Sequence, residues 1–206
     1  MQQLLGFHAV CTETDRSKLA EAMNAAAAAS GMTLVATQDQ KPVSRTYGGG
    51  ERPPIDVYMD LSGSDARVLV GPLERSVVEA WGAETLAAYL TRLSRGLGVR
   101  LGRSFRGGGG GHGIVQPQEL GGALEFVDWF QYFSAGIVAR WGASYVAAGP
   151  FWKTERFEDG SMVVLLGRDP FEGLGSRKAA AEYLGIELRP LLGKDFHGNP
   201  IELEWK

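Results

Sequence analysis

The sequence is poor in the residues that carry most catalytic and metal chemistry. It contains one cysteine, Cys11, so no internal disulfide can form and nothing requires an oxidising compartment. The three histidines, His8, His112 and His197, form no HxH, HExxH or Cys/His pattern, which leaves a metal site without support. We therefore expect neither a metal nor a cofactor.

Long apolar runs and a strong charge of one sign are also missing. No run approaches the about 18 residues of a membrane span, and the N-terminal segment MQQLLGFHAVCTETD lacks the basic start of a secretion signal. A net charge of −3 and a pI near 5.7 argue against nucleic-acid binding, which needs clustered lysine and arginine. We expect a cytoplasmic protein with no membrane or nucleic-acid partner.

Motifs for nucleophilic catalysis are absent as well. No GxSxG elbow occurs, and a lone cysteine such as Cys11 is more often a small buried hydrophobe than a nucleophile. Asp56 and Asp60 share one face of an expected strand, but such pairs are usually its solvated side. The chain does not read as an enzyme, although catalysis by Cys11 or a carboxylate pair remains an alternative.

Aromatic residues, by contrast, are concentrated. Half of them lie between Phe126 and Phe157. Because aromatic side chains bury large areas, this stretch is either the main core or a recognition face. The periodicity puts most of its rings on helix and strand faces, so we interpret the stretch mainly as core.

Hydrophobic periodicity and turn residues predict an α+β fold, a mostly antiparallel sheet with flanking helices. Strands are expected at residues 4–10, 32–37, 55–61, 67–70 and 124–133, and in a hairpin, 151–157 with 161–166, around Asp159-Gly160. Helices are expected at 15–30 with Asp15 as N-cap, at 73–95 with a break near Gly82, at 134–148 after Ser134, and after Ser176. Loops are expected at 38–54 and in the glycine-rich segment 106–113, and short extended pieces in the C-terminal tail.

Two segments resemble each other about 60 residues apart. VVEAWGAETLAAYL (77–90) and IVARWGASYVAAGP (137–150) share the pattern V-x-x-W-G-A-x-x-[LV]-A-A. Either the chain contains two similar strand–helix halves, or two amphipathic helices drew on the same few residue types. We expect one domain over 1–206, with 1–105 and 114–206 as its halves, joined by the glycine-rich loop.

The segment from Trp129 to Leu184 carries a more specific pattern of aromatic and turn residues. The matching residues are Trp129, Tyr132-Phe133-Ser134, Trp141-Gly142, Gly149-Pro150-Phe151-Trp152, Asp159-Gly160 and Asp169-Pro170-Phe171. In these residues, about a quarter of the chain, the sequence resembles immunity protein family 52 of bacterial polymorphic toxin systems. The resemblance implies an α+β protein that neutralises a secreted nuclease toxin of restriction-endonuclease-like fold, often delivered by a type VI secretion system. It implies binding without chemistry or cofactor.

An inhibitor of a basic nuclease site benefits from acidic side chains that steer the encounter. The candidate partner-binding residues are Asp56, Asp60, Glu155, Glu158 and Asp159. Solvated surface charge is the alternative for each of them. The second functional hypothesis is a small-molecule or peptide binding module, with a pocket lined by Trp129, Trp141 and Trp152.

Overall fold

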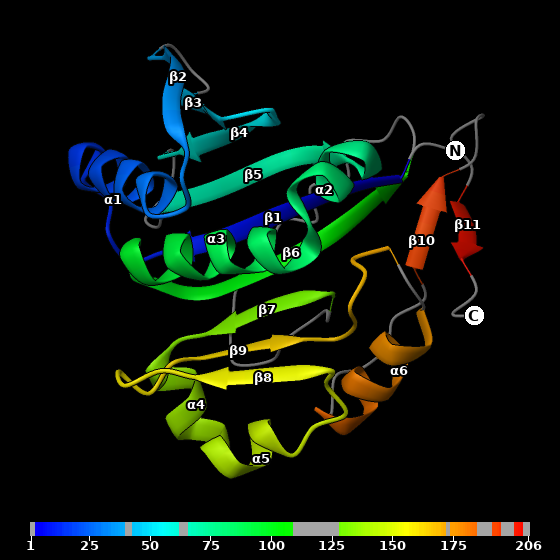
Figure 1. Cartoon of the computed structure of the whole chain (residues 1–206). Coiled ribbons are helices and arrows are strands. Elements are labelled where there is room, and N and C mark those ends of the chain that lie inside the picture. The colour runs from blue at the N-terminus through cyan, green and yellow to red at the C-terminus, as the bar shows by residue number, and fades with distance from the viewer. Residues whose placement is uncertain are drawn as a thin grey trace.

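The structure, a computed structural model, describes residues 3–39, 43–61, 66–108, 128–171, 174–184, 191–194 and 200–203. These residues form a nine-stranded antiparallel sheet of order β2-β3-β4-β5-β1-β6-β7-β9-β8, a two-stranded sheet of β10 and β11, and six helices (Figure 1). The α+β class and the antiparallel sheet expected from sequence are confirmed. Within the described residues, no helix is long and apolar enough to cross a membrane.

The strands of the large sheet are β1 (Gln3–Cys11), β2 (Thr33–Gln38), β3 (Val43–Gly49), β4 (Arg52–Asp60), β5 (Ala66–Glu74), β6 (Val99–Gly108), β7 (Phe130–Phe133), β8 (Lys153–Arg156) and β9 (Met162–Leu165); β10 (Leu191–Lys194) and β11 (Pro200–Leu203) form the small one. The helices are α1 (Arg16–Ala28), α2 (Arg75–Trp81), α3 (Ala83–Gly96), α4 (Ala135–Trp141), α5 (Ala143–Ala147) and α6 (Leu174–Tyr183).

Chain direction explains which face of the sheet each helix covers. The antiparallel pairings make β5 parallel to β6, with β1 between them, and β7 parallel to β8, with β9 between them. Crossovers that join parallel strands of one sheet are right-handed in about 98% of cases. Because β6 and β7 run in opposite directions, the same handedness sends α2 and α3 to one face and α4 and α5 to the other.

Two hydrophobic cores follow from this arrangement. The core under α1, α2 and α3, here called the α1–α3 face, includes Leu19, Leu90 and the β1 side chain Phe7. The core on the opposite side, the α4–α6 face, includes Val138 and Ala181. Alternation along the strands distributes side chains between the two cores, as a pleated strand requires.

The aromatic stretch supplies both cores. Phe130 meets Phe7 edge-on at a centroid distance of 5.5 Å on the α1–α3 face. Phe133 packs against Trp141 at 5.6 Å on the opposite face. The first rings of the stretch are therefore core, as predicted, whereas Tyr145 and Trp152 keep 42% and 37% of their surface exposed. Phe126 lies outside the described residues.

The sequence echo marks a repeated local structure. Both copies are two helices separated by one glycine with positive φ, 75° at Gly82 and 88° at Gly142. Each glycine N–H donates to the carbonyl four residues earlier, Val78 at 2.9 Å and Val138 at 2.8 Å. The break predicted near Gly82 is confirmed, and the single helix expected at 134–148 is instead divided at Gly142 in the same way.

Several other boundaries agree with the sequence. Asp15 caps α1 as predicted, its side chain accepting from the backbone N–H groups of Ser17 and Lys18. The β8–β9 hairpin lies where Asp159-Gly160 placed it, and the tail contains the short strands β10 and β11. Ser134 precedes α4 as predicted but makes no side-chain capping bond.

Three expectations were wrong. Residues 38–54 are not a loop, because β3 and the start of β4 lie within them. Proline is tolerated there because Pro53 and Pro54 fall at a register shift between β3 and β4, before β4 pairs with β5. Strand β6 includes residues 106–108 of the glycine-rich segment, whose remaining residues are not among those described. Ser176 lies inside α6, not at its N-cap.

Candidate partner-binding surface

Asp56 and Asp60 lie on β4, on the side of the sheet opposite α1–α3. They alternate with Val57 and Met59, which are buried on the α1–α3 face. Asp56 is exposed and accepts a hydrogen bond from the Thr46 hydroxyl of β3 at 2.7 Å. Asp60 is exposed and stands opposite Arg67 of β5 in the strand register. The predicted solvated face of this strand is confirmed.

The other acidic candidates lie at the far end of the sheet, on the β8–β9 hairpin. Glu155 is exposed on β8 opposite Val163, and Glu158 is exposed in the turn. Since β4 is third and β8 last in the strand order, the structure does not bring the two sets of carboxylates together.

Asp159 is bound within the hairpin turn. Its Oδ1 accepts from the backbone N–H of Ser161 at 2.9 Å and from the Ser161 hydroxyl. Its Oδ2 lies 3.5 Å from Nε of Arg95 on α3. The hydrogen bond from the Ser161 hydroxyl, followed by the backbone bond, lowers the pKa of Asp159. This carboxylate fixes the turn and connects it to α3.

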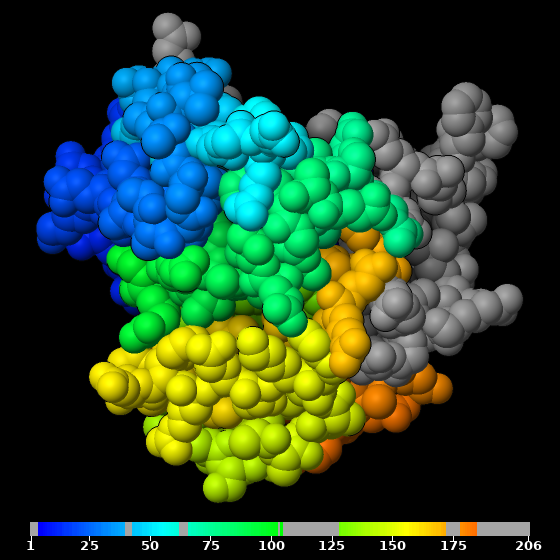
Figure 2. All heavy atoms as spheres, viewed as in Figure 1, coloured from blue at the N-terminus to red at the C-terminus, as the bar shows by residue number. Residues whose placement is uncertain are grey.

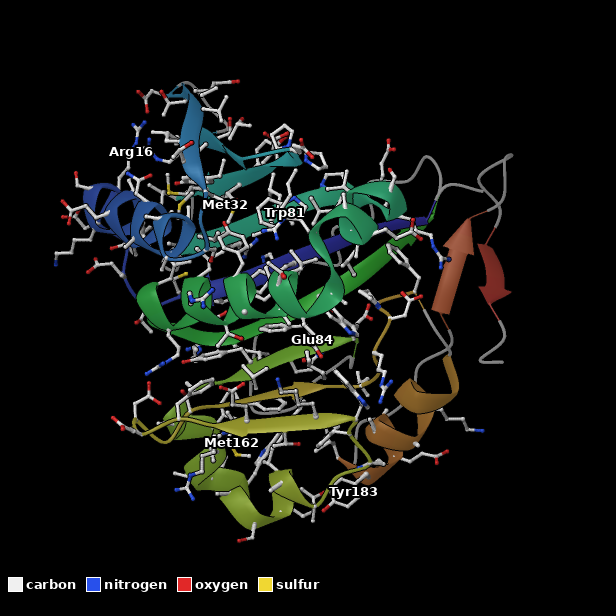
Figure 3. The ribbon with its side chains drawn as sticks, in the orientation of Figure 1. Arg16, Met32, Trp81, Glu84, Met162 and Tyr183 are labelled. Carbon is white, nitrogen blue, oxygen red and sulfur yellow. The ribbon has the colours of Figure 1, made fainter. Side chains whose placement is uncertain are left out.

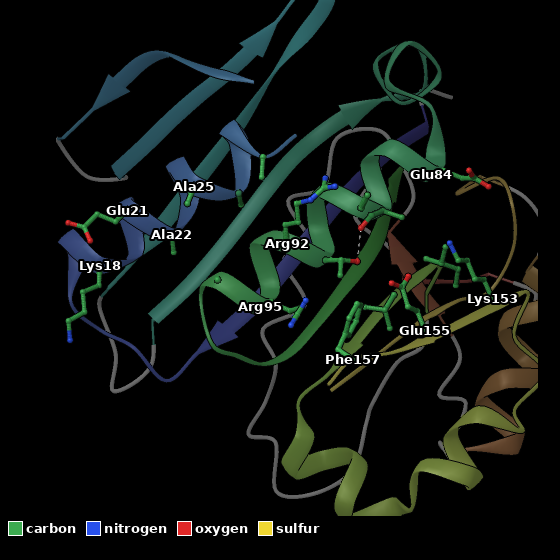
Figure 4. A pocket seen from close by; sticks show the side chains of 18 residues that line it. Lys18, Glu21, Ala22, Ala25, Glu84, Arg92, Arg95, Lys153, Glu155 and Phe157 are labelled. Atoms are coloured by element: carbon green, nitrogen blue, oxygen red, sulfur yellow. Dashed lines mark hydrogen bonds between the residues drawn. The ribbon is translucent and has the colours of Figure 1, made fainter. Parts of the chain in front are cut away.

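A groove of about 730 Å³ lies between α1 and α3 on one side and the β8–β9 hairpin on the other (Figure 4). Its floor includes small side chains, among them Ala22, Ala25 and Ala88. The charged residues that line it are Lys18, Glu21, Glu84, Arg92, Arg95, Lys153 and Glu155. The groove exists because α4 and α5 cover the other face of β7–β9, which leaves the α1–α3 side of β8 without a helix.

Two arginines of α3 are held in this groove by neighbouring groups. The Arg95 guanidinium lies over the Phe157 ring, 4.5 Å from its centroid, besides pairing with Asp159. Arg92 donates to the Ser30 hydroxyl at 3.1 Å. A partly ordered surface with both charge signs and small side chains suits a protein segment better than a small ligand, which needs an enclosed apolar pocket.

Sequence analysis identified Glu155 but missed the rest of the groove. The signal available was the alanine run of α1, MNAAAAAS, which is too rich in small residues to fill a core and leaves Ala25, Ala28 and Ala29 exposed. The partner surfaces, α3 and β8, come from distant parts of the chain.

The tryptophans do not form a common pocket. Trp129 is 3% exposed and donates its indole N–H to the Gly167 carbonyl at 2.9 Å. Trp141 is half-buried against Phe133. Trp152 lines a separate hollow of about 450 Å³ beside Arg168, whose guanidinium lies over its ring. The expected pocket of three tryptophans is therefore not formed.

The structure gives no support to catalysis by Cys11, the alternative considered from sequence. Cys11 is fully buried, and desolvation raises the pKa of its thiol to about 12, so it is not a thiolate at neutral pH. His8 points to the opposite face of β1, three residues away, and His112 and His197 lie outside the described residues. Among the residues with described positions, no three His, Cys, Asp or Glu side chains gather as a metal site would require.

At the far side of the molecule, the α4–α6 face carries an aromatic pair in which Tyr145 is exposed and Tyr183 is half-buried. Tyr145 of α5 stacks on Tyr183 of α6 with centroids 4.9 Å apart (Figure 3). Each hydroxyl donates to the other residue's backbone carbonyl. These rings attach α6 to α5, and each uses one ring face and its hydroxyl for the other residue.

Comparison with known proteins gives a fold and no family. No protein-family model matches the chain, and no curated protein matches it. Among solved structures, the chain is similar to a type VI secretion system (T6SS) protein of Pseudomonas aeruginosa, PA0821, with a TM-score of 0.64 and 15% sequence identity. The similarity covers 98% of this chain and 78% of that one. The two proteins therefore share their overall fold.

Proposed function

We propose that this protein is a cytoplasmic immunity protein, which binds and neutralises a toxin delivered by a type VI secretion system. The observation that carries the proposal is the fold similarity to a T6SS protein over 98% of the chain. It is independent of the resemblance of residues 129–184 to immunity protein family 52, and both point to the same biological setting. We propose a nuclease of restriction-endonuclease-like fold as the toxin, and binding without catalysis as the mode of action.

The positions of the family-like residues explain what the resemblance reports. Trp129 and Phe133 are core residues, Gly142 is the helix break, and Asp159 and Asp169 fix turns by accepting backbone N–H groups two residues ahead. These residues specify the scaffold. Toxin contact is then a property of the surfaces that the scaffold displays.

The groove between α1, α3 and the β8–β9 hairpin is the surface that we propose for the main contact. Its charges are of both signs, so it can pair with a partner segment that carries both, and Glu84 and Glu155 are the exposed carboxylates available to basic side chains of the toxin. Its small side chains permit close approach. Asp159 supports the groove by holding Arg95 and the turn.

The test uses the C-terminal domain of the protein encoded immediately upstream of this gene, as the candidate toxin. We expect co-elution in size-exclusion chromatography and protection of plasmid DNA when the two are mixed in equal amounts. Ala25→Trp, which fills the groove from an exposed position, is expected to weaken binding by about tenfold or more. Ala139→Trp is the matched control, because it places the same side chain on the exposed side of α4.

Absence of both co-elution and protection with the wild-type protein would overturn the immunity function. Co-elution and protection that both variants retain would overturn only the assignment to the groove.

A further inference from the structure

The two edges of the nine-stranded sheet differ in chemistry. Edge strands expose unpaired N–H and C=O groups, and proteins commonly protect them with charged side chains. At one edge, β8 (KTER) carries Lys153, Glu155 and Arg156. At the other, β2 (TLVATQ) carries no charge and no proline.

Strand β2 is open to solvent along its whole length. All six of its residues are exposed, including Leu34 at 43% and Val35 at 63%. Among the described strands, β2 pairs only with β3. The strand stands at the margin of the molecule, away from α2 and α3 (Figures 1 and 2).

The composition of β2 favours pairing with a further strand. Val and Thr have high β propensity, and an exposed strand with such residues is a template for strand addition. In that mode of recognition, main-chain hydrogen bonds supply affinity and alternate side chains supply specificity. An exposed edge strand without protecting charges favours aggregation unless a partner covers it.

We infer that β2 is a docking edge for an extended, basic segment of the protein toxin, which adds a tenth strand to the sheet. This inference rests on the proposed immunity function and names the partner surface that would use it. The groove described above reaches from the β8–β9 hairpin to α1, the helix that packs beside β2, whereas the docking edge is the outer side of β2.

Size decides against a second copy of this chain as the occupant. Self-pairing through β2 would use six residues from each copy, whereas a stable interface takes about 20–30 residues a side. A partner that pairs with β2 and continues over the adjoining strands meets no such limit.

Charge indicates the sign of the partner. Asp56 and Asp60 are exposed on β4, two strands inward from β2 and on one face. With strands about 4.8 Å apart, these carboxylates lie about 10 Å from β2, close to one Debye length. The cation on the intervening strand, Arg45, stands opposite Val57 and so belongs to the other face. On the face of Asp56 and Asp60, Arg67 of β5 stands opposite Asp60. The preference for a segment with lysine or arginine therefore rests on Asp56.

The experiment places lysines on β2, so that this edge carries charges as β8 does. Val35→Lys and Thr37→Lys alter exposed side chains, so the fold is expected to survive, as thermal unfolding will verify. The control on the edge that is already charged is Thr154→Lys on β8. Because Thr154 is half-buried, the fold of this variant is verified by the same thermal unfolding. Binding to the candidate toxin domain used above, the C-terminal domain of the protein encoded immediately upstream, is measured by calorimetry. Amide hydrogen exchange of residues 33–38 is measured with and without that domain.

We expect each β2 variant to weaken the affinity by about tenfold or more, because a lysine on the edge strand opposes strand addition and repels the basic segment. Thr154→Lys leaves the affinity unchanged, and the amides of β2 become protected only in the complex. Wild-type binding that the β2 variants leave intact, with no new protection, would overturn the docking edge while keeping the immunity function.

Two further results are decisive in the same experiment. If the wild-type protein fails to bind the toxin domain, both the proposed immunity function and the docking edge are contradicted. If the free protein sediments as a dimer that Val35→Lys dissociates, the occupant of β2 is a second copy and the toxin assignment is overturned.

Discussion

The Asp159 carboxylate receives donors from two elements, Ser161 in its own turn and Arg95 on α3. Both Asp159 and Arg95 are about half exposed, so solvent weakens the ion pair, and such pairs contribute about 0–1 kcal/mol. The local hydrogen bonds from Ser161 are the stronger interaction, because a charged acceptor strengthens them. The role of this residue is to hold the hairpin in one conformation against α3.

Asp159→Asn is expected to lower the free energy of unfolding at pH 7, by at most about 1 kcal/mol after solvent screening. Because the folded protein lowers the pKa of this carboxyl, the stabilisation is present above the unfolded pKa, near 3.9. It is lost as the pH falls through the lower folded pKa. Urea unfolding of both proteins between pH 7 and pH 2 measures the difference, which should shrink only in the acid range.

Glu158→Gln is the control for this effect. Glu158 is the neighbouring carboxylate and is exposed in the same turn, so its change should alter stability by less than about 0.5 kcal/mol at any pH. An Asp159→Asn difference that stays constant down to pH 2 would mean that the carboxylate charge does not stabilise the turn.

At the scale of elements, the helix–glycine–helix unit occurs twice with the same backbone. Val78 and Val138 are buried before the break, and Leu86 and Val146 are buried after it. In each copy the glycine carbonyl accepts from the N–H four residues later, at 3.0 Å in the first and 3.1 Å in the second. The break turns the second helix so that both segments bury their apolar sides. Two halves of common origin remain a prediction.

Gly82→Ala and Gly142→Ala are each expected to lower the free energy of unfolding by about 1–2 kcal/mol, because an L-residue at positive φ is strained. The penalty is one of backbone conformation, since an added Cβ would meet nothing closer than 3.9 Å at either site. Gly136→Ala is the matched control, because Gly136 lies in α4 with open space around it. This change should stabilise by about 0.5–1 kcal/mol. Thermal and urea unfolding measure all three, and equal effects would contradict the explanation.

Sequence predicted best those elements whose signals are local. The Asp15 cap and the Asp159-Gly160 turn depend on a few neighbouring residues, and both were placed correctly. Strand β3 was missed because most of its residues are polar or glycine. Only Val43 and Tyr47 bury large apolar side chains in this strand. Strand β6 was missed because its glycines suit a close approach: a Cβ on Gly102 would lie 2.7 Å from the Phe7 ring. Both strands exist because of neighbours that are distant in sequence.

At the scale of the whole molecule, the candidate surfaces follow from topology. The groove depends on which face of the sheet each crossover helix covers. That face follows from the directions of the strands together with their order in the sheet. The exposed edge β2 likewise depends on being last in that order. No window of sequence contains this information, which explains why the acidic residues proposed from sequence fell on two unrelated surfaces.

The position of Cys11 makes it a reporter of global unfolding. It lies in β1, between β5 and β6 near the middle of the sheet, and burial raises the pKa of its thiol to about 12. We expect no reaction with a thiol reagent at pH 8 except through opening of the sheet. The urea dependence of the labelling rate should equal that of global unfolding. Fast labelling with a weak urea dependence would show that β1 opens locally. Because Cys11 is the chain's only cysteine, no other thiol contributes signal.

Among the described helices, α1, α2 and α3 cover one face of the sheet, and α4 and α5 cover the other. The side of β4 away from α1–α3 presents the exposed Asp56, which accepts from Thr46, and the side of β8 that lines the groove presents Lys153 and Glu155. A molecule seated on one of these surfaces leaves the other accessible from the reverse direction. The two surfaces therefore face opposite directions, so a substitution in one can be tested without altering the other.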